Sequence, residues 1–153
     1  MLQYMHIPLY SYTTLGVNSA WNGDYHLNIN MQMSYWAADA VGASETVKPL
    51  LSFLTSLANS SEDTIRKLYN CSGWVAHGFT DNSYIGGLYG DPQWALCVTC
   101  GAWLLVQAFE HISYKWNATL LYDVLLPIMR KSVLFFTGIH TNILLIIYCK
   151  IVA

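Results

Sequence analysis

The sequence predicts an all-α protein with long loops between its helices. Apolar residues recur at spacings of three and four in several stretches of the 153-residue chain, which is the period of one helix face. No stretch shows the sustained apolar–polar alternation of a half-buried strand, and no internal repeat is visible. The segments between the periodic stretches are rich in Gly and Asn, which is typical of loops.

The first half of the chain predicts helices that follow an irregular or extended approach over residues 21–30. Residues 31–41 fit a short helix that Gly42 would end. Ser44 opens a second helix, because serine is a preferred N-cap residue. This helix has an apolar stripe at spacings of three and four: Leu50, Leu54, Leu57 and Ala58.

A third helix and a long loop follow. Ser60 or Ser61 would cap the helix, which runs to about Asn70. Residues 71–91 contain six Gly and Asn residues and form a long loop. Long ordered loops are usually functional, so this segment is a candidate part of a site.

Two more helices are predicted in the second half of the chain. Asp91 and Pro92 form an N-cap and first-turn pair, and the helix that they open reaches roughly His111. A last helix covers about residues 118–136, with a kink expected at Pro127.

Composition limits the classes of partner. Charged residues make up 10% of the chain, against roughly 25% in a typical soluble domain, which suggests the inner layer of something larger. The net charge of −2 and the lack of a Lys/Arg cluster argue against a nucleic-acid partner. Residues 139–153 are largely apolar, and an apolar run extended back to Val133 would be long enough for a membrane helix. Gly138, His140, Thr141 and Asn142 interrupt this run, so a membrane span is not favoured.

The run from Asp24 to Trp36 has the composition of a sugar-binding wall. In an extended segment alternate residues point the same way, so His26, Asn28 and Asn30 would converge on one small polar group. Two Asn carbonyl oxygens could hold a water molecule there. The residue pattern alone favours another interpretation, in which Asn28 and Asn30 cap the next helix and His26 is a hydrogen-bonded core residue.

Trp74, His77 and Asp81 in the long loop also suit a sugar site, with a stacking ring and two groups for hydroxyls. The equally favoured alternative is a loop that Trp74 tethers to the core. His77 and Asp81 are too few to hold a metal ion, and no phosphate-cradling Gly loop occurs. We therefore expect neither a metal nor a cofactor.

Cys97 and Cys100 form a C-x-x-C pair near a predicted helix start. Redox activity would need a βαβ context and a zinc site a second pair, so two small buried apolar residues on a helix are expected. Glycosylation sequons begin at Asn59, Asn70 and Asn117, and such tripeptides give weak support for a secretory route.

Blocks spread over roughly residues 16–138 resemble one family in the right order. The first, Trp21–Trp36, is similar to the pattern W-N-x-D-Y-H-x-N-I-N-x-Q-M-N-Y-W, which is long and specific. Three shorter blocks resemble G-W-V-x-H, D-P-x-W-A-L and G-G-A-W-L: Gly73–His77, Asp91–Leu96 and Gly101–Leu104. The family is glycoside hydrolase family 95, the inverting α-L-fucosidases that act on α-1,2-linked fucose.

The resemblance implies an incomplete (α/α)6 toroid of about five helices with long loops. Residues 16–138 would be a partial catalytic domain, between an unmatched segment, 1–15, and an apolar tail outside the family, 139–153. The resemblance also implies that Asn28 and Asn30 hold and activate the attacking water. The expected substrate-binding residues are His26, Trp94, His77 and Asp81.

One departure from the family bears on activity. The general-acid glutamate belongs to a P-S-x-S-P-E segment that would follow the helix ending near Phe136, and the apolar tail stands there instead. The aspartate base is also missing. We therefore expect a fragment that is inactive alone, with a fucosylated glycan as partner; a non-catalytic carbohydrate-binding remnant is the alternative. A secreted or lysosome-like compartment is weakly favoured for the full-length family member.

Overall fold

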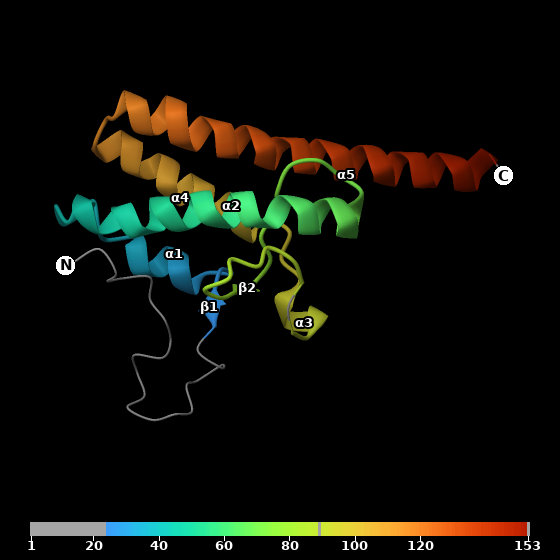
Figure 1. The fold of residues 1–153 in the computed structure, drawn as a ribbon, viewed down its shortest axis with the longest axis horizontal. Coiled ribbons are helices and arrows are strands. Elements are labelled where there is room, and N and C mark those ends of the chain that lie inside the picture. Colours follow the sequence, from blue (N-terminus) through green and yellow to red (C-terminus); the bar gives the residue numbers. More distant parts are fainter. Residues whose placement is uncertain (1–23, 89, 153) are drawn as a thin grey trace.

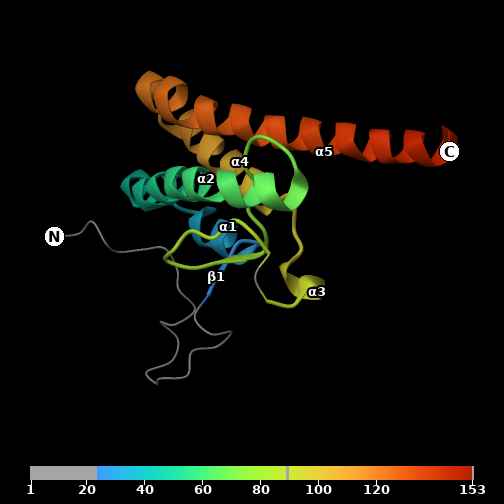
Figure 2. The same ribbon diagram turned by 45° about the vertical axis from the view of Figure 1, so that its right-hand side comes forward.

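The computed structural model describes residues 24–88 and 90–152, with side chains to residue 143. Helices α2 (Lys48–Tyr69), α4 (Cys100–Tyr114) and α5 (Leu126–Val152) pack side by side in one layer (Figure 1). The shorter elements lie on one side of this layer (Figure 2): β1 (Tyr25–His26), α1 (Asn30–Tyr35), β2 (Phe79–Thr80) and α3 (Pro92–Ala95).

The all-α prediction is confirmed, because helices make up nearly all regular structure in the described residues. The single exception there is the pair of two-residue strands. Closure into a toroid stays an expectation from the resemblance. The predicted segment 1–15 lies outside the described residues.

Helix α2 corrects the prediction of two separate helices between residues 44 and 70. A short 3-10 helix, η3 (Ser44–Val47), leads directly into α2, which continues to Tyr69 without a break. Ser61 caps nothing, because its buried hydroxyl donates to the carbonyl oxygen of Leu57 one turn earlier at 2.7 Å. The predicted end is confirmed: Asn70 closes α2 in the left-handed conformation.

The helix predicted from Pro92 to His111 is broken into α3 and α4. Asp91 caps α3 as expected, accepting a hydrogen bond from the backbone N–H of Gln93 at 2.9 Å. The chain then becomes extended at Leu96. A disulfide joins Cys97 to Cys100 across this break, so the prediction of two apolar residues on a helix is wrong for this pair.

Reducing the Cys97–Cys100 disulfide should lower the free energy of unfolding by about 2 kcal/mol, since so small a ring removes little entropy from the unfolded chain. Urea denaturation with and without a reductant measures the change. The Cys97→Ser, Cys100→Ser double variant should match the reduced protein. If the reductant destabilises the double variant equally, the disulfide is not the cause.

Helix α5 begins after a π-helix, η4 (Leu120–Leu125), where a kink at Pro127 is expected. Proline has no N–H for the bond to the carbonyl four residues earlier, and the widened turn accommodates this loss. The helix then runs without interruption into the predicted apolar tail, as far as Val152.

Within the described residues, the segment Pro92–Tyr114 is long and apolar enough to cross a membrane by length and composition. Half of its most apolar window is buried inside the protein, as in the core helices of many soluble proteins, and the break after α3 interrupts it. This feature therefore gives only weak support for a membrane span.

The main core cluster combines buried side chains of α1, α2, α4, η4 and α5 with residues of the long loop. Trp74 is fully buried in it, and its indole N–H donates to the carbonyl oxygen of Ile128 at 2.8 Å. This confirms the interpretation of Trp74 as the residue that tethers the long loop.

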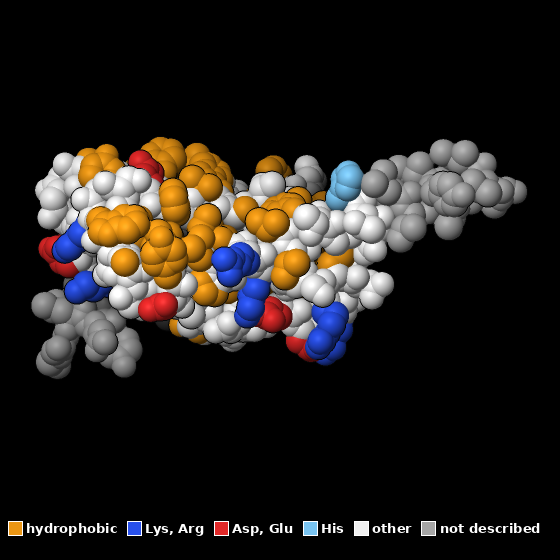
Figure 3. All heavy atoms as spheres, turned by 90° about the horizontal axis from the view of Figure 1, so that it is seen from above, with side chains coloured by type: hydrophobic (Ala, Val, Ile, Leu, Met, Phe, Trp, Pro, Cys, Tyr) orange, Lys and Arg blue, Asp and Glu red, His pale blue; other side chains and the backbone are white. Residues whose placement is uncertain are grey.

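Apolar side chains are also exposed on the outer face of the layer, where Figure 3 shows them gathered. Among the described residues of α4, η4 and α5, the exposed large apolar side chains include Trp103, Val106, Phe109, Tyr122, Val133 and Leu134. This exposure is consistent with the low charge content and suggests a surface that a larger protein would cover.

Candidate functional site

A two-stranded antiparallel sheet joins the two sequence segments proposed to bind sugar. Tyr25 pairs with Thr80 and His26 pairs with Phe79, so the Asp24–Trp36 run lies against the long loop. The Tyr25 hydroxyl also donates to the side-chain oxygen of Asn82 at 2.8 Å. The two groups of candidate residues therefore belong to one region of the molecule.

Asn28 and Asn30 follow this sheet in a different conformation from the one expected. The strand ends at His26, and residues 27–29 form a turn, so the alternation that would align all three side chains is not present. Asn28 is exposed in the turn, and Asn30 is a half-buried residue at the start of α1. The N-cap residue is Ile29, without a side-chain cap bond, so the capping interpretation is wrong.

The turn that carries Asn28 is held from both sides. The backbone N–H of Leu27 donates to the carbonyl oxygen of Gly78 at 2.8 Å, and Gln32 donates from its side-chain amide to the Leu27 carbonyl at 2.7 Å. Gln32 is fully buried, so this contact is shielded from water. Sequence analysis did not single out Gln32, although a lone polar residue between Met31 and Met33 is a signal of this kind.

Asp24, His26 and Asp81 form a titratable group at the sheet. Burial lowers the pKa of His26, and the nearby Asp24 carboxylate partly opposes this. Burial also raises the pKa of Asp24; His26 opposes that effect and the Asp81 carboxylate adds to it. The His26 ring packs on the ring of Phe79 with 4.6 Å between centroids. Two carboxylates and an imidazole therefore lie within electrostatic reach of one another.

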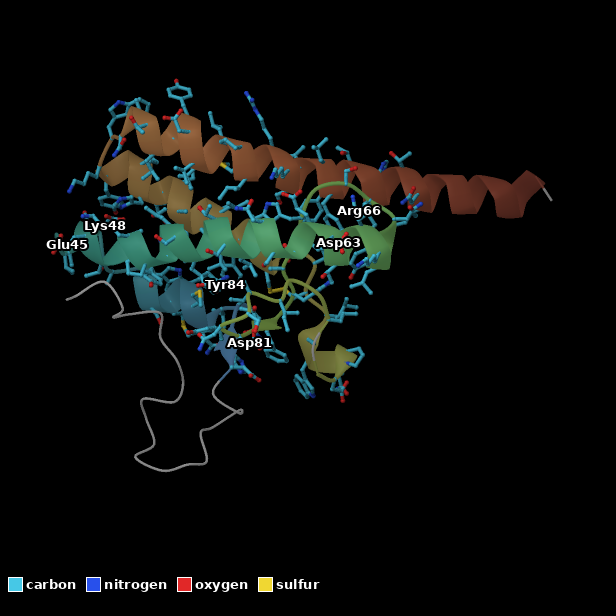
Figure 4. The ribbon with its side chains drawn as sticks, viewed as in Figure 1. Glu45, Lys48, Asp63, Arg66, Asp81 and Tyr84 are labelled. Atoms are coloured by element: carbon cyan, nitrogen blue, oxygen red, sulfur yellow. A yellow bond between two sulfur atoms is a disulfide. The ribbon has the colours of Figure 1, made fainter. Side chains whose placement is uncertain are left out.

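Asp81 begins a turn in the long loop, in the part where Figure 4 labels it beside Tyr84. Its carboxylate accepts a hydrogen bond from the backbone N–H of Ser83 at 2.7 Å. The residue is half-buried.

His77 is fully buried two residues before β2. Its Nδ1 accepts the backbone N–H of Cys97 at 3.3 Å, and its Nε2 lies 2.7 Å from the Tyr69 hydroxyl. Both ring nitrogens are thus bonded to protein groups. His77 connects the loop to α2 and to the disulfide, and its predicted contact with a sugar is not favoured by this burial.

Trp94 lies on α3 and is 67% exposed. Its helix is docked on the loop, because the backbone N–H of Gly78 donates to the carbonyl oxygen of Ala95 at 2.8 Å. An exposed indole has an apolar face of the kind on which a pyranose ring can stack. No group of three or more metal-ligating side chains occurs in the described residues.

Comparison with known proteins identifies the family of this chain. The model of the glycosyl hydrolase family 95 catalytic domain matches residues 13–142. The chain belongs to this family. It is 34% identical to Alpha-L-fucosidase 2 of Arabidopsis thaliana over 115 residues, which are 74% of this chain and 14% of that protein. It is 31% identical to Probable alpha-fucosidase A of Aspergillus niger over 125 residues, 80% of this chain and 16% of the relative.

A third family 95 relative, Probable alpha-fucosidase A of Aspergillus oryzae, is 30% identical over 122 residues, which are 70% of this chain and 17% of that protein. The chain thus spans about a sixth of the length of these relatives.

A buried pair between the turns after α1 and α4 was not predicted in this family 95 chain. The Asp39 carboxylate lies 2.8 and 3.0 Å from Nδ1 of His111, and both side chains are only 7% exposed. The pair joins the turns after α1 to α4. An Asp in one segment and a His in another give no local signal, because their separation along the chain is 72 residues.

The free energy of unfolding should fall as the pH is lowered from 7 to about 5.5. Burial lowers the pKa of His77, so the folded chain keeps this ring neutral while the unfolded chain binds a proton near pH 6.5. Protonation therefore favours unfolding below that pH. His77→Gln should reduce the slope of unfolding free energy against pH, measured by urea denaturation. An unchanged slope in His77→Gln would mean that other groups, such as His26, cause it.

Proposed function

We propose that this chain carries the water-positioning half of an α-L-fucosidase site that hydrolyses α-1,2-linked L-fucose with inversion. Family membership together with the β1–β2 pairing supports the proposal, because the pairing brings the Asn28–Asn30 turn beside the long loop. Asn28 and Asn30 would hold the attacking water through their side-chain oxygens. His26, Asp81 and Trp94 would contact the fucosylated glycan.

An amide oxygen orients water but is a poor base, so inversion needs a carboxylate base and a separate general acid. The resemblance assigns both to parts of the family domain that have no counterpart in residues 1–153. General acid catalysis typically contributes about 10²–10⁴-fold to the rate. We therefore propose that the 153-residue chain binds its glycan but does not release fucose on its own.

Purified chain incubated with a 2′-fucosylated oligosaccharide should release no fucose, while titration detects binding. Asn28→Ala and Asn30→Ala should each weaken binding about tenfold, roughly 1.4 kcal/mol. Asn59→Ala is the matched control, because Asn59 is also exposed but lies on α2. Release of fucose contradicts the proposed inactivity.

A non-catalytic carbohydrate-binding surface is the second candidate, and the exposed ring of Trp94 favours it. The same titration separates the two. Binding that Trp94→Ala abolishes but Asn28→Ala and Asn30→Ala leave intact would indicate a stacking surface without a water site. Loss of binding in the asparagine variants supports the fucosidase site.

A further inference from the structure

We propose that Asn117 is a site of N-linked glycosylation. It begins the tripeptide Asn117-Ala118-Thr119, which lies in the connection between α4 and η4. All three residues are exposed, so an enzyme can reach both the amide and the hydroxyl. Asn-x-Thr is the acceptor pattern for this modification.

The geometry of Asn117 leaves its reactive nitrogen available. Its Oδ1 accepts a hydrogen bond from the backbone N–H of Leu120 at 3.0 Å and so caps the helical turn at residues 118–119 that leads into η4. In the transfer, Nδ2 bonds to C1 of the first sugar while the bond from C1 to the diphosphate of a lipid-linked oligosaccharide breaks. The diphosphate leaves, and Nδ2 gives up one proton to solvent. Oδ1 takes no part, so the helix cap persists in the glycosylated protein.

The other two sequons are less accessible. In Asn59-Ser60-Ser61 the third residue is fully buried within α2, and its hydroxyl donates to the Leu57 carbonyl. In Asn70-Cys71-Ser72 the middle residue is buried, and Asn142 of α5 donates to the backbone oxygen of Asn70 at 3.4 Å. Of the three tripeptides, the one at Asn117 alone has all of its residues exposed.

Two further observations fit a glycan at Asn117. Trp116 is 68% exposed and Tyr114 is also exposed, so apolar rings lie next to the acceptor where the first sugars could cover them. The Cys97–Cys100 disulfide is typical of an oxidising compartment, which is where this modification occurs.

The position is also compatible with the candidate site. Figures 1 and 2 show the α4–η4 connection at the left end of the long helices, while α3 lies below these helices and away from that end. A glycan at Asn117 would therefore extend away from Trp94 and leave the sugar-binding region open.

The test is expression of the full chain behind a cleavable signal sequence in eukaryotic cells. The secreted protein is treated with an amidase that removes N-glycans in ¹⁸O water, which converts a glycosylated Asn to labelled Asp. Peptide mass should show the label at Asn117 and not at Asn59. Asn117→Gln and Thr119→Ala should each lose one glycan, whereas Thr119→Ser and Asn59→Gln should keep it.

A secreted chain with unmodified Asn117 overturns the proposal. Should secretion fail, translation with microsomes gives the same readout on chains inside the vesicles. If the chains inside the vesicles show no increase in mass that depends on Asn117 and Thr119, the proposal is also overturned.

Discussion

Gly73→Ala should destabilise the chain by more than about 4 kcal/mol, enough to prevent stable folding. Gly73 has a φ of +93°, and a Cβ there would overlap the backbone oxygen of Lys131 and lie 2.8 Å from the backbone nitrogen of Phe135. Both atoms belong to α5, which cannot give way as a flexible side chain could. Circular dichroism and urea denaturation measure the loss.

Gly42→Ala is the matched control for Gly73→Ala. Gly42 has a similar φ of +79°, but a Cβ there would meet no atom within 4 Å. Gly42→Ala should lower the free energy of unfolding by only about 1–2 kcal/mol, which is the cost of the left-handed conformation for a residue with a Cβ. Equal effects of the two variants would show that contact with α5 does not explain Gly73.

The Gly73 contact also bears on the candidate site. The next residue, Trp74, anchors the loop. Its indole N–H donates to the carbonyl oxygen of Ile128, and its backbone N–H donates to the carbonyl oxygen of Lys131. His77 and Asp81 follow on the same loop. A variant that separates the loop from α5 should therefore also lose glycan binding.

Asp39→Ala should lower the free energy of unfolding by about 3–5 kcal/mol, because it leaves His111 buried without its carboxylate partner. Thermal and urea unfolding measure the change. A double-mutant cycle with His111→Gln should show coupling, since each single variant breaks the same pair. Additive losses would mean that packing, rather than the pair, is responsible.

Asp63→Ala is the control for Asp39→Ala. Asp63 contacts Arg66 and Lys67 on α2, as Figure 4 shows for Asp63 and Arg66, and all three side chains are largely exposed. An exposed pair of this kind contributes up to about 1 kcal/mol. A loss in Asp63→Ala as large as in Asp39→Ala would contradict the role of burial.

Local rules predicted the features whose causes lie within a few residues. The apolar stripe of α2, its end at Asn70 and the Asp91 cap of α3 depend on neighbouring side chains and backbone groups, and the structure confirms all three. The same rules wrongly divided α2 at Ser60 and Ser61. A serine inside a helix can bond to the carbonyl one turn earlier, and burial decides which option it takes.

The candidate site was predicted in part. The two segments were recognised from their residue types. Their contact in the fold depends on the pairing of β1 with β2, each only two residues long. Strands that short have no detectable alternation. Neither the turn at Asn28 nor the burial of His77 could be predicted. The turn depends on a bond from Leu27 to Gly78 in the long loop, and the ring of His77 is held by Tyr69 and Cys97 from other segments.

The helical class, the family and the candidate site residues could be read from the sequence, since these depend on periodicity and on residue types in order. The Cys97–Cys100 disulfide, the Asp39–His111 pair and the close approach of Gly73 to α5 emerged only from the folded arrangement. Each of these depends on the positions of backbone segments after packing. A local pattern has no information about such distances, so it cannot separate a bonded cysteine from a buried one or a paired Asp from a solvated one.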